Sequence, residues 1–169
     1  AKETQVTGIG LHSGKKVTLK LHPALSDTGI VFKRSDLVDS QEMQATAMSV
    51  GATENNTTLG TGNEVIHTVE HLLAAFYGLG INNVYCEIDG PEVPIMDGSS
   101  ASFVFLLKEV GVRNLNSSKK FMIITKPVRV EDGEKWAQIE PAENLIIDST
   151  IVFAHPIIKT QSQVFSFCC

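Results

Sequence analysis

The sequence predicts an α+β fold, in which a sheet packs against two helices and a strand-rich segment follows. Three observations support this class. Apolar and polar residues alternate, as is typical of strands, at Val17–Leu21 and again at Asn83–Asp89. Two segments, beginning near Thr68 and Phe103, instead repeat their apolar residues every three or four positions, which is typical of helices. After Ser118 only strand-like runs remain, so both helices belong to the first part of the chain.

The first expected strands precede a long loop. Val17–Leu21 is followed by His22-Pro23, and the proline favours the end of the strand there. A second short strand is expected at Ile30–Phe32. Residues 51–63 are rich in Gly, Asn and Thr, which favour turns, so we expect a loop with a candidate short strand at Thr57–Leu59.

Two amphipathic helices flank the strand expected at Asn83–Asp89. The first has one apolar face, formed by Val69, Leu72, Leu73 and Phe76. Glycines at positions 78 and 80 predict its end. The second has an apolar face formed by Phe103, Val104, Leu106, Leu107 and Val110. Asp97–Ser100 offers N-cap residues before it, and Gly111 predicts its end.

A polar connector at residues 112–118 is the expected domain boundary. We therefore expect residues 1–116 to form the first α+β domain and residues 117–169 to form the incomplete start of a second, similar domain. Strands are expected in the latter at Phe121–Val130, Lys135–Ile139 and Leu145–Phe153, with a hairpin turn at Asp132-Gly133. The chain has no initiator methionine and stops at Phe-Cys-Cys, so we expect it to be a fragment.

Composition and charge exclude several functions. With 14 Lys+Arg against 19 Asp+Glu, the formal net charge is −5, and no long basic run is present to bind nucleic-acid phosphates. The longest apolar stretches fall far short of the roughly 18 residues that a membrane span needs. Cys86, Cys168 and Cys169 form no CxxC pair, which favours a reducing compartment, and Cys86 is expected in the core. Nothing in the sequence indicates an obligate protein partner.

The run most informative about chemistry is His67–His71 (HTVEH), at the start of the first predicted helix. Histidine is a common metal ligand, and a glutamate beside a metal-bound water can act as its general base. Glu70 and His71 lie about 100° apart on a helix, so both can reach one rim of a cleft. In isolation, HxxEH is also the inverzincin protease signature, in which His67 and His71 would both bind zinc. A solvated helix start without catalytic function is a third interpretation.

Further motifs stand in a fixed order around this run. They are Thr7–Gly14 (TGIGLHSG), Thr68–Leu72 (TVEHL), Glu92–Ser99 (EVPIMDGS) and Val130–Lys135 (VEDGEK). In this order and at these spacings, the set resembles the bacterial UDP-3-O-acyl-N-acetylglucosamine deacetylase family, the zinc amidases of lipid A synthesis. The resemblance covers nearly the whole chain. It is specific because four motifs occur in order, whereas each alone is a weak signal.

The resemblance implies a cytoplasmic enzyme of a Gram-negative bacterium that uses Zn²⁺ to hydrolyse the N-acetyl group of UDP-3-O-acyl-N-acetylglucosamine, releasing acetate. In that family pattern Glu70 matches the general base and His71 matches the first zinc ligand. His67 matches no family ligand. The resemblance therefore favours deacetylation over the protease interpretation.

Three further residues match family positions. Asp97 matches an aspartate of the family's site, although a helix cap or turn residue explains it equally well. Lys135 matches a lysine near the nucleotide diphosphate, a group that attracts cations; the alternative is an exposed hairpin lysine. His12 matches a glycine-flanked histidine near the family's active site.

The zinc site implied by the resemblance is incomplete in this chain. A catalytic zinc uses three protein ligands and one open position, and the family places its other two ligands and its acid histidine downstream. His155, the only histidine after His71, matches a strand end of the second domain and not the ligand helix. We therefore expect the isolated chain to bind zinc weakly and to lack activity. The alternative function is a catalytically inactive fragment or pseudoenzyme with the same fold.

Overall fold

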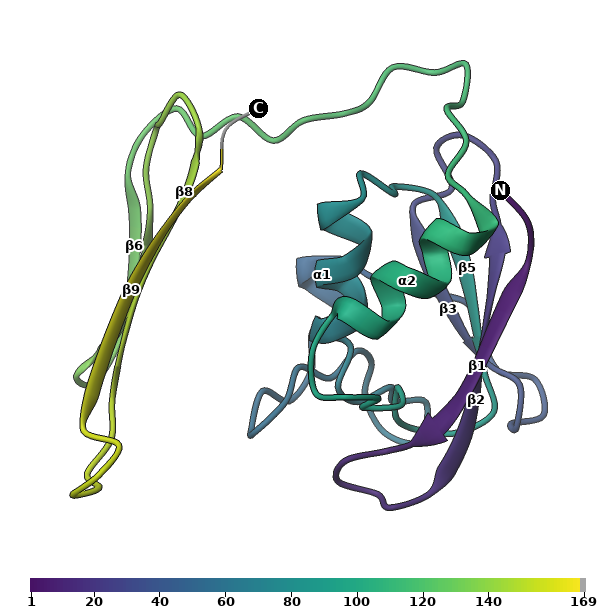
Figure 1. The fold of residues 1–169 in the computed structure, drawn as a ribbon, viewed down its shortest axis with the longest axis horizontal. Helices are drawn as coiled ribbons and strands as arrows, with labels where there is room; N and C mark the ends of the chain where they lie inside the picture. The colour runs from purple at the N-terminus through teal and green to yellow at the C-terminus, as the bar shows by residue number, and fades with distance from the viewer. Residues whose placement is uncertain (168–169) are drawn as a thin grey trace. The chain divides into compact units, whose positions relative to one another are not determined.

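A five-stranded sheet with two helices on one face forms the first unit of the computed structural model, Ala1–Lys119 (Figure 1). The strands are β1 (Thr4–Ile9), β2 (Lys16–Pro23), β3 (Ile30–Arg34), β4 (Met43–Gln44) and β5 (Val84–Ile88). They lie in the order β1-β2-β5-β3-β4, in which only β3 and β5 are parallel neighbours. The α+β class is confirmed.

The two helices, α1 (Glu70–Gly78) and α2 (Ala101–Val110), contact each other on this face of the sheet (Figure 1). Both match the predicted segments, except that Val69 is the N-cap of α1 and not part of it. The residues that α1 buries, Leu72, Ala75 and Phe76, recur with helical spacing. A short 3-10 helix, η1 (Ala47–Ser49), leads into the predicted loop.

The core lies between the helices and the inner face of the sheet. Alternate residues of the central strands enter it, namely Val17, Leu19 and Leu21 from β2 and Val84, Cys86 and Ile88 from β5. Phe32, Phe76 and Phe103 fill the space between the layers and are at most 1% exposed. Cys86 lies in the core as predicted, and burial raises the pKa of its thiol.

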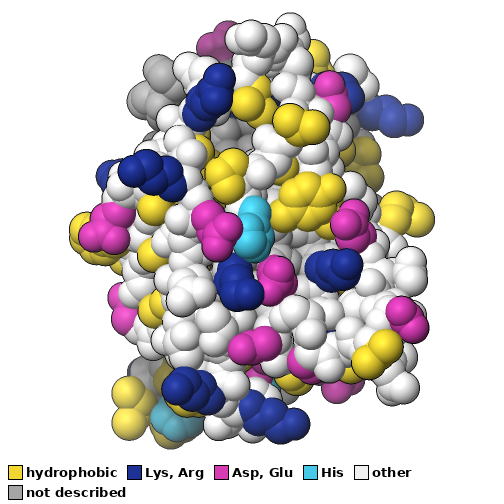
Figure 2. Space-filling model, turned by 90° about the vertical axis from the view of Figure 1, so that its right-hand side faces the viewer, with side chains coloured by type: hydrophobic (Ala, Val, Ile, Leu, Met, Phe, Trp, Pro, Cys, Tyr) yellow, Lys and Arg dark blue, Asp and Glu magenta, His cyan; other side chains and the backbone are white. Residues whose placement is uncertain are grey.

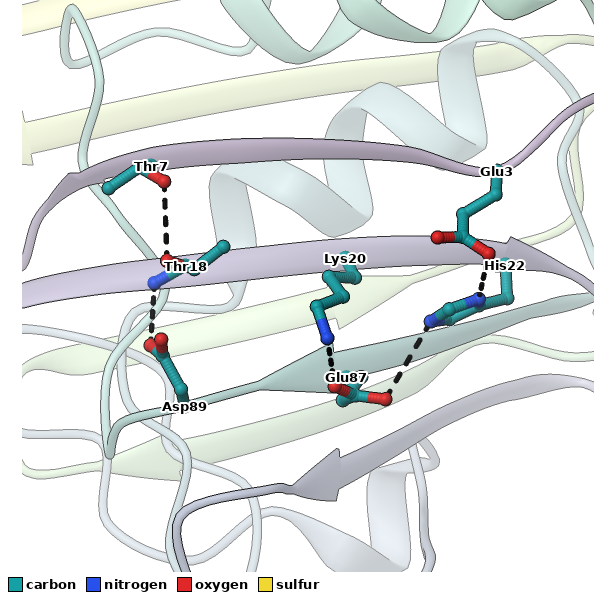
Figure 3. A network of polar contacts seen from close by, with 7 residues as sticks. All are labelled: Glu3, Thr7, Thr18, Lys20, His22, Glu87 and Asp89. Atoms are coloured by element: carbon teal, nitrogen blue, oxygen red, sulfur yellow. Dashed lines mark hydrogen bonds and ion pairs between the residues drawn. The ribbon is translucent and has the colours of Figure 1, made fainter.

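The opposite face of the sheet carries charges of both signs, with hydrophobic side chains among them (Figure 2). Lys20 Nζ donates a hydrogen bond to Glu87 Oε1 at 2.7 Å across the β2–β5 pair (Figure 3). His22 lies between two carboxylates, with Nδ1 3.1 Å from Glu3 Oε2 and Nε2 3.8 Å from Glu87 Oε2. Partly exposed ion pairs contribute little to stability. The main effect of these charged side chains is to keep this face of the sheet in contact with water.

Arg34 is a buried guanidinium at the end of β3. Its Nε and Nη2 atoms donate to the two oxygens of Asp36 at 2.7 and 2.6 Å, which is a bidentate pair. Its Nη1 atom donates to the carbonyl of Val65 at 2.9 Å. The side chain therefore ties the end of β3 to the segment that leads into α1.

The second unit begins at Lys120 and contains two separate β-hairpins in its described part. They consist of β6 (Val128–Asp132), β7 (Lys135–Ile139), β8 (Leu145–Val152) and β9 (Thr160–Phe167). The predicted hairpin is confirmed, but its turn is Gly133-Glu134, because Asp132 still pairs with Lys135. The structure describes residues 1–167, so Cys168 and Cys169 lie outside it. Whether residues 1–116 and 117–169 correspond to domains stays a prediction.

Some sequence-based expectations about the strands were wrong. The strand expected from Phe121 begins only at Val128, because Pro127 has no N–H to donate to a β-ladder. The candidate strand at 57–59 is reduced to isolated bridges that Leu59 makes. β1, β4 and β9 were not predicted. No helix within residues 1–167 has both the length and the apolar character needed to cross a membrane.

Truncation of Phe76 to alanine is expected to lower the free energy of unfolding by about 3–5 kcal/mol, because the ring is fully buried and a cavity would remain. Phe105→Ala is the matched control in α2. Its ring is 70% exposed, so we expect a change of about 0.5 kcal/mol or less. Urea unfolding followed by far-ultraviolet circular dichroism measures both. Equal losses would contradict the assignment of the helix faces.

Asp36→Asn is expected to weaken the acid dependence of stability. The hydrogen bonds and charge of Arg34 hold the pKa of Asp36 below its usual range. The stabilisation is therefore complete above the unfolded-state pKa of about 3.9 and is lost as the pH falls through the lower folded-state value. The variant should be less stable at pH 7 and lose less stability on acidification. Unfolding free energies between pH 7 and pH 2 test this, with the exposed Glu42→Gln as control.

Candidate active site

Glu70 and His71 form the first turn of α1, and both are half-buried. The Glu70 carboxylate accepts a hydrogen bond from the Thr57 amide at 3.0 Å through Oε2. The glycine- and asparagine-rich loop thus folds back onto the start of the helix. A carboxylate in the first turn is also favoured by the helix dipole. The fold therefore holds a carboxylate and an imidazole side by side at a helix start, as the sequence predicted.

His67 lies before α1 and is held by other contacts. Its Nδ1 is 2.8 Å from the Thr58 hydroxyl, and its amide donates to the Pro91 carbonyl at 2.8 Å. Because α1 begins only at Glu70, His67 and His71 do not occupy successive turns of one helix. The i, i+4 arrangement on which the protease interpretation depends is therefore not formed.

Thr68 connects His67 to the helix in an unusual backbone conformation. Its φ is +59°, in the left-handed region that β-branched residues rarely adopt. The residue is 2% exposed, and its hydroxyl donates to Glu92 Oε1 at 3.0 Å. Such strain persists only where surrounding contacts fix it. One contact that holds this residue is the hydrogen bond from its hydroxyl to the buried Glu92 carboxylate.

That carboxylate, Glu92, is 1% exposed and accepts hydrogen bonds from three residues. Besides Thr68, the His12 amide donates to Oε1 at 2.9 Å and the Ser13 amide donates to Oε2 at 2.8 Å. Burial is the largest single influence and opposes ionisation, but the hydrogen bonds from His12, Ser13 and Thr68 together outweigh it. They hold the pKa of Glu92 below its usual range. Glu92 is therefore an ionised group inside the protein.

Three of the four sequence motifs meet around Glu92. The Ile95 amide donates to the Ile9 carbonyl at 3.0 Å, which joins the EVPIMDGS run to the TGIGLHSG run. The Val93 amide donates to the His67 carbonyl at 3.0 Å, which joins it to the segment before TVEHL. At Gly10 an added Cβ would overlap the Glu92 carboxylate, so the backbone approaches as closely as only glycine permits.

Sequence reasoning missed Glu92 because its partners are distant in the chain. Its bonds to His12 and Ser13 join residues 80 and 79 positions apart. One local signal was available: Glu92 stands among Pro91, Val93 and Pro94, and a charged residue in such apolar surroundings needs partners.

His12 and Asp97 lie in these same motifs but are exposed. His12 is anchored through its backbone amide to Glu92. Asp97 Oδ1 accepts the Ser99 amide at 3.2 Å and the Ser99 hydroxyl at 3.1 Å, and these bonds lower the pKa of Asp97. The Ser99 hydroxyl in turn accepts the amide of Ala101. The predicted capping by Asp97–Ser100 is therefore partly wrong, because the N-cap Ser100 makes no side-chain capping bond.

The remaining sequence candidates lie in the second unit. Lys135 begins β7 and pairs with Asp132 next to the hairpin turn. His155 Nδ1 accepts hydrogen bonds from the amides of Ile157 and Ile158 at 3.2 and 3.3 Å. The His155 ring therefore accepts these hydrogen bonds from within its own turn.

A zinc ion fits the described residues only in part. His71 supplies one imidazole with the Glu70 carboxylate beside it. No three His, Cys, Asp or Glu side chains within residues 1–167 come together in a way that could hold a metal ion. A catalytic zinc site takes three protein ligands. The described residues alone therefore do not form such a site, although the donor at its proposed first position is present.

Comparison with known proteins assigns the chain to a family. The family model described as LpxC, UDP-3-O-acyl N-acetylglycosamine deacetylase, matches residues 1–169. Three curated relatives carry the name UDP-3-O-acyl-N-acetylglucosamine deacetylase. The chain is 51% identical over 166 residues to the protein of Aliivibrio fischeri, 50% over 157 residues to that of Acidithiobacillus ferrooxidans, and 51% over 160 residues to that of Sodalis glossinidius.

These alignments cover 96%, 93% and 94% of this chain, but 54%, 52% and 52% of the relatives. The chain therefore spans about half the length of the curated relatives that it matches. Since the family model covers its whole length and the motifs identified above lie within the match, the chain belongs to the family of UDP-3-O-acyl N-acetylglycosamine deacetylases.

Proposed function

We propose that this chain carries part of the active site of a zinc-dependent deacetylase, which hydrolyses the N-acetyl group of UDP-3-O-acyl-N-acetylglucosamine and releases acetate during lipid A synthesis. The observation that carries the proposal is the pairing of Glu70 and His71 on the first turn of α1. The names of the relatives support the substrate and the reaction.

Glu70 would take the proton from the attacking water. Amide hydrolysis requires a base within hydrogen-bond reach of that water, and a carboxylate suits this role. The Thr57 amide binds one oxygen of Glu70 and so limits the orientations of the carboxylate. When bound with His71 as one of its ligands, zinc would supply Lewis-acid polarisation of the amide carbonyl and lower the pKa of the water.

Other residues would contribute to substrate binding. We propose that Lys135 binds the diphosphate, because an ammonium group is a suitable partner for phosphate oxygens. His12 and Asp97 are exposed and belong to motifs that meet around Glu92, so they are proposed as further site residues. The net charge of −5 means that local cations, and not the overall field, must attract the UDP group.

The proposed location is the cytoplasm of a Gram-negative bacterium. Cys86 is free and buried, as expected of a protein from a reducing compartment. No nucleic acid and no obligate protein partner are proposed. The second candidate function is a catalytically inactive fragment or pseudoenzyme, which is favoured by the absence of any three-ligand metal cluster within residues 1–167.

The isolated 169-residue chain is expected to bind zinc weakly and to release no acetate from the substrate, because its described residues supply only part of a zinc site. Metal content after dialysis and an acetate-release assay test this. Stoichiometric, tightly bound zinc with turnover would contradict the prediction.

A chimera of the relatives' length can be made by joining residues 1–169 to the second half of a relative. In this chimera Glu70→Gln is expected to lower kcat by about 100- to 10,000-fold while zinc content is unchanged, because only the base is lost. His71→Ala should lower both kcat and zinc content, because a ligand is lost. Steady-state kinetics and metal analysis measure these effects.

His67→Asn is the control for this pair of variants. Its side chain lies outside α1 and contacts Thr58, so zinc content should be unchanged. Loss of zinc in His67→Asn but not in His71→Ala would support a different metal site and contradict the proposed one.

A further inference from the structure

We propose that Glu92 is a positioning residue for the deacetylase site. Its buried carboxylate fixes the His12–Ser13 loop and Thr68 to one point, and thereby sets the direction in which the first turn of α1 presents Glu70 and His71. The inference rests on the proposed function, because it assigns Glu92 a role in that reaction.

Both oxygens of the Glu92 carboxylate face hydrogen-bond donors. Oε1 lies 2.9 Å from the His12 amide and 3.0 Å from the Thr68 hydroxyl, so one oxygen holds both segments. Oε2 lies 2.8 Å from the Ser13 amide. The His12 and Ser13 amides can only donate, the Thr68 hydroxyl donates here, and an ionised carboxylate is a pure acceptor. The carboxylate therefore satisfies a set of donors that an amide could satisfy only in part.

The link to the helix runs through Thr68. This residue stands two positions before Glu70, and its φ of +59° determines the direction in which the chain enters α1. A threonine leaves this conformation readily unless it is held. The bond from its hydroxyl to Glu92 is a side-chain contact that opposes such a change. Loss of the bond should therefore alter the placement of Glu70 and His71 without removing either side chain.

The link to His12 runs through the loop backbone. Gly10 lies so close to the Glu92 carboxylate that no Cβ fits, and the Gly14 amide closes the loop by donating to the Gly10 carbonyl at 3.0 Å. The position of the His12 side chain therefore depends on Glu92, although Glu92 contacts only its backbone. One buried group thus connects three candidate residues of the site.

The decisive variant is Glu92→Gln in this chimera of the relatives' length. Whichever carboxylate oxygen the glutamine NH₂ group replaces, it would face a backbone N–H, so either the His12 bond or the Ser13 bond is lost. We expect kcat to fall by about 10- to 100-fold, the size typical of partners that orient metal-site ligands, with KM changed by about twofold or less. Hydrogen exchange at the His12 and Ser13 amides should become faster, which is a readout independent of activity.

Glu87→Gln is the matched control. It removes a carboxylate that accepts a hydrogen bond from Lys20 on the opposite face of the sheet. We expect kcat and amide exchange at His12 to stay at the parent values. If Glu92→Gln matches Glu87→Gln in kcat per folded molecule, then Glu92 has only a structural role and the inference is overturned.

Thr68 provides a second test if Glu92→Gln does not fold. Thr68→Val removes the hydroxyl and keeps the branched shape, whereas Thr68→Ser keeps the hydroxyl. We expect kcat to fall in the valine variant and to return to near the parent value in the serine variant. Equal kcat values for the two variants would overturn the inference.

The two proposals fail in different ways. If the parent chimera shows no zinc-dependent deacetylation, the proposed function fails and the inference fails with it. If the parent is active and the Glu92 and Thr68 variants retain its kcat, only the role of Glu92 fails.

Discussion

Enclosing a carboxylate in protein is costly unless donors replace the water that it loses, and Glu92 meets donors from three residues. These bonds join strand-to-strand loops and a helix start that are far apart in the sequence. The conformation of Thr68, the close approach of Gly10 and the entry into α1 all depend on this group. The site is thus built around an ionised side chain and not around apolar packing alone.

The helices and strands whose apolar residues are regularly spaced could be predicted from the sequence. The apolar spacing of α1 and α2 and the alternation in β2 and β5 are local signals, and each matches the structure. β1 was not predicted because Thr4–Ile9 contains only two large apolar residues among threonine, glutamine and glycine. It forms because β2 provides a partner along its whole length. Pairing of this kind is a tertiary effect that a local pattern does not contain.

The candidate site likewise has one part that the local sequence predicts and another that depends on distant contacts. The TVEHL run predicted that Glu70 and His71 lie together at a helix start, because neighbours on a helix are placed by local geometry. The motifs alone also indicated the family, and the family match confirms that resemblance. Glu92 and the structural contacts of His67 could not be predicted, because they depend on which distant segments the sheet brings together.

The central position of β5 has a consequence for how the protein folds during synthesis. β5 lies between β2 and β3, so neither of these strands has its full set of partners until residues 84–88 have been made. Before then both strands have open edges that can recruit other chains. Glu92 follows β5 closely, so the loop at His12 must wait about as long for its anchor. Long-range closure of this kind slows folding.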